Sequence, residues 1–231
     1  MQGVVRVSHL LVRGWLACVV AAGCGNSAAS NGPDAPAAPD GSNTSGTGLA
    51  VRWATEPATI PGDAGSNIAI TSLLFRVANL RVIGDAGPGD TRTSIDAIQL
   101  AWAADTVPAT VAFDDAPTGV YSRVVLLADG NLSAYSYEVA GIVKFEGVLT
   151  PFTIHDRAPL AISLDTSAVL DPGRLFVLRV TVRIDQALQS IDFRKFRQVA
   201  GGLVLDTADA AMSDFRDELT KDFEVHADGD H

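Results

Sequence analysis

Candidate catalytic side chains are few in this chain. His155 is followed directly by Asp156, and a histidine with an aspartate partner is the general-base pair that activates a serine nucleophile. Phe152 and Ile154 precede His155 in the alternating pattern of a strand and are expected to point inward. We therefore predict that His155 is a solvated histidine on the outer face at a strand end.

Paired carboxylates would provide a second kind of chemistry, because most glycoside hydrolases act with two of them. Asp114 and Asp115 stand just before the turn Pro117–Gly119, where stabilising the turn is their expected role. The chain contains no G-x-S-x-G, H-E-x-x-H or Gly-Lys phosphate-loop motif. We assign no catalytic residue, and glycan or peptide hydrolysis stays an alternative.

Three short segments carry side chains of the metal-ligand type. The ending His226–His231 has imidazole and carboxylate groups, but it is shorter than a calcium loop of the EF type. The loops Gly62–Asn67 and Gly84–Asp90 could hold Ca²⁺ through their aspartates. We expect an acidic tail at 226–231 and no bound metal or cofactor. The basic cluster Arg194–Arg197 is expected at a solvated edge, with contact to anionic envelope components as the alternative.

Cys24 has the most informative surroundings. Residues 1–23 contain Arg6 and Arg13, and the uncharged, mostly apolar run Gly14–Ala22 follows. This run is about half of the roughly 20 residues that a membrane-spanning helix needs, so it is typical of an export signal. Because Cys18 lies inside the run, processing would leave Cys24 as the one remaining cysteine.

The order small–small–Gly–Cys ending at Cys24 resembles the lipobox of bacterial lipoproteins. The resemblance implies that the cysteine receives a diacylglycerol and becomes the mature N-terminus. Gly25 stands where an aspartate often retains lipoproteins in the inner membrane, so by analogy we expect the outer membrane, on its periplasmic face or at the cell surface. A soluble secreted protein cut at a nearby small residue and a buried core cysteine remain alternatives.

Composition separates a linker from a folded body. Asn26–Gly48 consists mainly of Gly, Ser, Asn, Pro, Ala and Thr, which cannot bury enough apolar surface to fold, so we predict a tether over 24–48. As a flexible chain it would span about 25–30 Å. The whole chain carries a formal charge of −10, which disfavours binding to nucleic acid.

Short apolar runs separated by turn residues fill the body, 49–225. The clearest strand is Leu175–Ile184, in which every second residue is apolar. The run Ile68–Ile83 loses its alternation near Ala78, which indicates a bulge or a break. Asp129–Asn131 is typical of a tight hairpin turn. Further strands are predicted over Tyr121–Leu127, Tyr135–Val139, Ile142–Phe145, Pro151–Ile154 and Leu160–Leu164.

One helix is predicted near the C-terminus. Ala208, Met212, Phe215, Leu219 and Phe223 recur at three- and four-residue steps with charged residues between them. Asp206 or Thr207 is expected to cap the start of this helix. Six or more short strands with one short C-terminal helix predict a mainly β protein, an antiparallel β-sandwich.

Two segments carry a resemblance to a known family. Phe113–Leu126, with its turn and Gly119-Val-Tyr121 before a strand, and Asp171–Ile191 are similar to an uncharacterised bacterial lipoprotein domain with a prealbumin-like sandwich. The resemblance implies a fold but no reaction. We therefore expect an outer-membrane lipoprotein that acts as a non-catalytic binding or envelope-structural module, through an envelope protein or an extracellular polymer. An accessory subunit of an envelope complex is the closest alternative.

Overall fold

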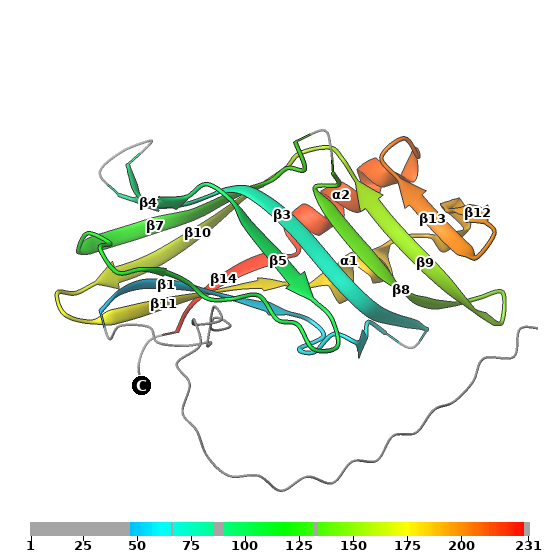
Figure 1. Cartoon of the computed structure of the whole chain (residues 1–231), viewed down its shortest axis with the longest axis horizontal. Coiled ribbons are helices and arrows are strands. Elements are labelled where there is room, and N and C mark those ends of the chain that lie inside the picture. The colour runs from blue at the N-terminus through cyan, green and yellow to red at the C-terminus, as the bar shows by residue number, and fades with distance from the viewer. Residues whose placement is uncertain (1–46, 66, 86–89, 132–133, 229–231) are drawn as a thin grey trace, which may run out of the picture. The chain divides into compact units, whose positions relative to one another are not determined.

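The structure is a computed structural model that describes residues 47–65, 67–85, 90–131 and 134–228. Backbone contacts divide the chain into 1–39 and 40–231, and the fold below is that of the second unit. The structure is mainly β, as predicted, with a short helix near the C-terminus (Figure 1). In the described residues the strands form one sheet of four and one of ten.

The smaller sheet has the order β14-β11-β1-β6. It consists of β1 (Gly48–Thr55), β6 (Val111–Phe113), β11 (Leu175–Val182) and β14 (Phe223–Asp228). β1 and β11 run parallel, from Gly48 opposite Leu175 to Thr55 opposite Val182. An all-antiparallel sandwich is therefore wrong at this pair. Parallel neighbours need a long connection, and here more than a hundred residues separate the two strands in the chain.

The larger sheet is built on β3 (Ile68–Gly84), a strand of 17 residues. Its main path runs β10-β7-β3-β8-β9-β13-β12, and β2, β4 and β5 also pair with β3. The bounds are β2 Gly62–Asp63, β4 Thr91–Ile95, β5 Ile98–Trp102, β7 Gly119–Ala128, β8 Tyr137–Phe145, β9 Val148–Asp156, β10 Leu160–Leu170, β12 Arg197–Val199 and β13 Gly202–Asp206. β13 pairs with β9 in parallel, which is the second departure from the antiparallel prediction.

β7 and β8 follow one another along β3 and do not fold back on each other. Ala128 at the end of β7 lies opposite Val77, and Tyr137 at the start of β8 lies opposite Phe75. The residue between them, Arg76, donates its backbone N–H to the carbonyl of Ser136 at 2.9 Å and accepts from the N–H of Asp129 at 2.8 Å. The hairpin predicted at Asp129–Asn131 is therefore wrong: both strands pair with the same long strand.

A bulge and a close approach explain two irregularities of the sequence. The pairing of β3 with β7 shifts register between Val77 and Asn79, which confirms the bulge predicted near Ala78. Tyr135–Val139 and Ile142–Phe145 were expected as separate strands, but Tyr137–Phe145 is one strand that passes through Gly141. A Cβ atom on Gly141 would lie 2.6 Å from the ring of Phe152, so a glycine is needed there for packing.

One continuous core joins the two sheets. Phe75 of β3 contacts Phe223 of β14 with 5.5 Å between ring centroids, and it also contacts Tyr137 and Trp102. Tyr121, whose side chain is fully buried, donates its hydroxyl to the carbonyl of Pro117 at 2.6 Å. This bond fixes the turn before β7. It explains why a tyrosine stands at the end of the Gly119-Val-Tyr121 motif.

Two helices are described, both on the inner side of the larger sheet (Figure 1). Ile184 was expected to end the strand Leu175–Ile184, but β11 stops at Val182 and Ile184 begins α1 (Ile184–Ser190). This short helix was not predicted, because Ile184 continues the period-two pattern of the strand, although Ala187 and Leu188 do not. The 3₁₀ turn η1 (Phe193–Lys195) follows.

α2 (Ala211–Lys221) is the predicted C-terminal helix, with Met212, Phe215 and Leu219 buried. Its start differs from the prediction, because no side chain caps it and Asp206 ends β13. Phe223, expected as the last helical residue, begins β14. That strand continues to Asp228, which pairs with Val177, so the acidic tail predicted from His226 is wrong for its first three residues.

Candidate functional site

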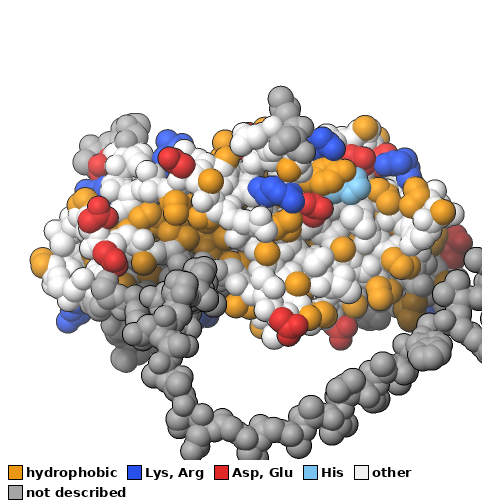
Figure 2. All heavy atoms as spheres, viewed as in Figure 1, with side chains coloured by type: hydrophobic (Ala, Val, Ile, Leu, Met, Phe, Trp, Pro, Cys, Tyr) orange, Lys and Arg blue, Asp and Glu red, His pale blue; other side chains and the backbone are white. Residues whose placement is uncertain are grey.

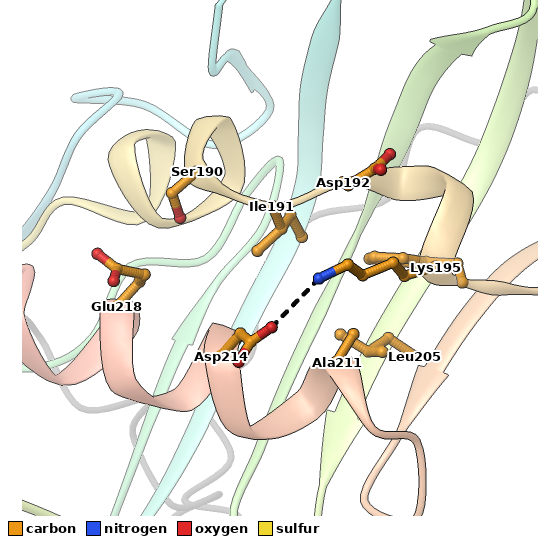
Figure 3. Close-up of a pocket in the computed structure, with 9 residues that line it drawn as sticks. Ser190, Ile191, Asp192, Lys195, Leu205, Ala211, Asp214 and Glu218 are labelled. Carbon is orange, nitrogen blue, oxygen red and sulfur yellow. Dashed lines mark hydrogen bonds and ion pairs between the residues drawn. The ribbon is translucent and has the colours of Figure 1, made fainter.

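A pocket lies where the segment after α1 crosses over α2 (Figure 3). Its volume is about 190 Å³. Apolar side chains from four places in the fold form one part of the lining: Ile191, Phe196, Leu205 and Ala211. Polar side chains form the remainder: Ser190, Asp192, Lys195, Asp214 and Glu218.

The helical repeat of α2 and the turn η1 place these side chains. Ala211, Asp214 and Glu218 are three and four residues apart, so they share one face of α2. On the opposite wall Asp192 caps η1 by accepting the backbone N–H of Arg194 at 3.0 Å. Burial of Phe193 and Phe196, whose rings lie 4.7 Å apart, holds this wall against the sheet.

Each carboxylate of the pocket has a cationic partner. Lys195 Nζ lies 3.3 Å from Asp214 Oδ2, the contact drawn in Figure 3. Lys221 Nζ lies 2.8 Å from Glu218 Oε1, and Arg194 Nε lies 3.5 Å from Asp192 Oδ1. Because these pairs compensate one another, the pocket favours an uncharged apolar group over an ion. An apolar floor inside a polar rim is the arrangement found around anchor side chains at protein interfaces.

A buried ion pair fixes α2 to the sheet. Asp156 at the end of β9 is fully buried, and its Oδ2 accepts from Arg216 Nε at 2.8 Å and Nη2 at 2.7 Å. The Tyr137 hydroxyl donates to the same oxygen at 3.1 Å, and the N–H of Ala158 donates to Oδ1 at 3.0 Å. Burial, together with the neighbouring carboxylate of Asp156, raises the pKa of Tyr137. The network therefore sets the position of the helix that forms one wall of the pocket.

His155 is more enclosed than predicted, since 17% of its side chain is exposed. Its ring stacks on Tyr135 with 4.3 Å between centroids, and Nε2 lies 3.3 Å from Asp206 Oδ2. Its acidic partner is thus Asp206 on β13 and not the adjacent Asp156, whose carboxylate points into the core. His155 lies on the outer face at a strand end, as predicted, but it is not solvated, because β13, paired in parallel with β9, brings Asp206 beside it.

The His155–Asp206 pair belongs to a row of charged and polar side chains on the outer face of the sheet. Glu138 lies opposite His155 across the strands and binds Arg76 at 2.7 Å. At the other end Arg197 lies 3.6 Å from Asp206, and its Nε is 2.9 Å from Asp209. The row stabilises strand pairing, since opposite charges face each other across neighbouring strands.

The pKa of Asp206 predicts how its contribution to the stability of the fold depends on pH. Burial alone would raise its pKa, but hydrogen bonds from His155 and the N–H of Thr207, with the charge of Arg197, lower it below the ordinary 3.8. Because the folded pKa is the lower one, this carboxylate stabilises the fold above pH 3.8 and stops doing so as pH falls through its folded pKa. We expect His155→Gln to raise the pKa of Asp206, measured by NMR titration of the carboxyl carbon.

His226→Gln is the matched control, because His226 lies 3.4 Å from Glu224 on β14, away from the row. It should leave the titration of Asp206 unchanged. An Asp206 that titrates at its ordinary value in the unmodified protein would contradict the prediction.

The structure also locates the other residues that the sequence suggested for catalysis or calcium binding. Asp114 and Asp115 are exposed in the turn between β6 and β7. Asp85 and Asp90, which belong to the candidate calcium loop, lie 3.4 Å and 3.0 Å from Arg92. Asp63 is in β2. Nowhere in the described ranges do three His, Cys, Asp or Glu side chains gather as a metal site would require.

The basic cluster Arg194–Arg197 was expected to be solvated. Its charged groups are largely exposed but pair with Asp192, Asp214 and Asp209, while Phe196 is buried. The prediction therefore missed that Lys195 and Phe196 line the pocket.

No family model, curated protein or solved structure matches the chain. The resemblance to a prealbumin-like lipoprotein domain stays a prediction. Cys24 and the tether up to residue 46 lie outside the described residues, as does His231. None of the helices in the described part of the chain has the length and apolarity to cross a bilayer.

The pocket was not predicted from the sequence. One signal was available: Ala211, Asp214 and Glu218 share a face of the predicted helix beside the apolar stripe. A second signal, on the opposite wall, was the helical spacing of Ile184, Ala187, Leu188 and Ile191, but Ile184 was assigned to the strand and neither α1 nor η1 was predicted.

Proposed function

We propose that this protein is a membrane-tethered, non-catalytic binding module of the bacterial envelope. Cys24 carries the lipid, and the segment before β1 provides reach, which ends one residue earlier than predicted because Gly48 already pairs with Leu175. The β-sandwich holds one apolar side chain of a polypeptide partner in the pocket between α1 and α2. The outer membrane is the proposed location, by the analogy drawn from Gly25. The partner is therefore a protein or peptide that reaches the same membrane.

The pocket is the observation that carries the binding role. Its volume of about 190 Å³ suits one large side chain, such as leucine or phenylalanine. Ile191, Phe196 and Leu205 provide apolar contact, and the ion pairs of Asp192, Asp214 and Glu218 form the rim. A polar rim that excludes water around an apolar anchor is typical of the residues that dominate binding energy at interfaces.

The surroundings of His155 favour binding over nucleophilic chemistry. Its ring nitrogen is paired with Asp206 and its ring face with Tyr135. Ser136, whose backbone N–H donates to the carbonyl of Asp156 at 2.6 Å, donates its hydroxyl to the carbonyl of Arg157 and accepts from the N–H of Gly130. These contacts give the His155 ring and the Ser136 hydroxyl a role in holding neighbouring strands together.

Filling the pocket tests this proposal. N-acetyl-leucinamide is the probe, and we expect it to shift the amide NMR resonances of Ile191, Leu205 and Ala211. Ala211→Phe places a ring in the pocket and should weaken probe binding at least about tenfold. Thermal unfolding of the variant checks that the fold is retained.

Ser213→Phe is the matched control, since Ser213 is exposed on the same helix and does not line the pocket. It should leave the shifts intact. Probe shifts that are absent, or that persist in Ala211→Phe, would contradict a binding role for the pocket.

A further inference from the structure

The turn between β8 and β9 carries two exposed aliphatic side chains. Glu146 and Gly147 form the turn with φ angles of 51° and 86°, the left-handed values of a two-residue hairpin. Val148 and Leu149 follow immediately, and 65% and 73% of their surfaces are exposed. Phe145, opposite Val148, is half-buried, so the core ends at the base of this tip.

More apolar residues continue from the tip along β8 and β9. Ile142 lies opposite Pro151, and Ile142 is 38% exposed. Figure 2 shows hydrophobic side chains spread over the surface that β8 and β9 form, with few charged side chains among them.

Charge around the tip is balanced, in contrast to the rest of the chain. Lys144 lies opposite Leu149, and Arg194 lines the same hollow beside the turn. Glu146 and Asp192 line that hollow too, so two cations balance two anions. The whole chain carries −10, and an acidic body is repelled by anionic lipid. The tip is therefore a part of the body that can approach a lipid surface without this electrostatic cost.

We infer that the Val148–Leu149 tip inserts into the interface of the bilayer to which the protein is tethered. A standard protein interface covers roughly 800 Å² on each partner, far more than two side chains at a convex turn offer. Lipid requires no matching surface, and each aliphatic side chain adds favourable burial there. The inference rests on the proposed tether, which keeps the tip at high effective concentration beside the membrane.

Tryptophan fluorescence in vesicles tests the insertion. Full-length Leu149→Trp, purified from membranes and reconstituted in phosphatidylethanolamine–phosphatidylglycerol vesicles, should add emission that is blue-shifted compared with the emission that an added tryptophan in water gives. Lipids brominated on their acyl chains should quench the added emission. Val107→Trp is the control, because Val107 is 80% exposed in the segment after β5, away from the tip.

The outcomes separate the tether from the tip. Selective quenching of Leu149→Trp supports the inference. Equal quenching of both variants, or of neither, while the protein floats with the vesicles overturns the inference and leaves the tether standing. If the unmodified protein does not float, or floats equally well as Cys24→Ser, the proposed tether fails and the inference that rests on it is overturned as well.

Discussion

Cys24→Ser should release the protein from the membrane fraction almost completely. Serine cannot form the thioether that holds the diacylglycerol, so the chain would lose its acyl groups. Each buried CH₂ contributes about 0.8 kcal/mol, and two chains anchor a protein firmly where one holds it marginally. Fractionation and flotation of cell membranes measure the release, and incorporation of a clickable palmitate analogue measures the acylation itself.

Cys18→Ser is the control for this experiment, because it changes the other cysteine without touching the residue expected to be modified. The variant should stay in the membrane and keep its label. If Cys24→Ser remains in the membrane with its label, lipidation at Cys24 is wrong, and the proposed localisation is wrong with it. If the anchor is confirmed, protease treatment of intact cells establishes the side of the membrane on which the anchored domain lies.

Asp156→Ala should have the largest effect on stability. The carboxylate is fully buried and accepts from Arg216, Tyr137 and the backbone of Ala158. Removing one partner of a buried pair leaves the others unsatisfied, and we expect the free energy of unfolding to fall by about 2–4 kcal/mol. The value is below that for a fully enclosed pair, because 27% of the Arg216 side chain is exposed and can be hydrated.

Urea unfolding measures this loss, with Asp165→Ala as the matched control. Asp165 forms the same kind of pair with Arg123 at 2.9 Å, but 84% of the Asp165 side chain is exposed. An exposed pair contributes about 0–1 kcal/mol. Equal losses in the two variants would contradict the role given to burial. Since Arg216 holds α2, Asp156→Ala should also weaken binding of N-acetyl-leucinamide.

Local patterns in the sequence predicted elements whose cause is also local. The alternation in Leu175–Val182 reflects a strand with one face in the core, and the slip at Ala78 reflects a real shift of register. The stripe Met212, Phe215 and Leu219 predicted α2 for the same reason. Each of these signals depends on a side chain's neighbours within a few positions.

Other features depend on partners far away in the chain. The turn residues Asp129–Asn131 indicate a reversal of the chain, but they cannot show that β3 is long enough to pair with β7 and β8 in succession. The parallel pairing of β1 with β11 has no local pattern either. The partner of His155 was missed for this reason, because β13 is placed beside β9 by tertiary structure.

The pocket also combines features that have a local cause with features that depend on distant parts of the chain. The α2 wall could be predicted from helical spacing. Ile184, Ala187, Leu188 and Ile191 also follow a helical repeat, but Ile184 continues the alternation of β11 and was therefore assigned to the strand. Asp192 and Lys195 lie in the segment beyond that repeat. Phe193 and Phe196 fold that segment by packing on the sheet, for example through the contact of Phe193 with Phe152 at 5.2 Å. A site assembled in this way is visible only in three dimensions.

The position of β1 has a mechanical consequence. β1 is the first described strand after the proposed tether, and it lies inside the smaller sheet between β11 and β6. If Cys24 is fixed in the membrane while a partner holds the pocket, any pulling force enters the fold through Gly48. A pull along β1 loads its hydrogen bonds to both neighbours in shear, so they share the force instead of breaking one by one. The proposed tether would thus attach the protein through a strand suited to bear tension.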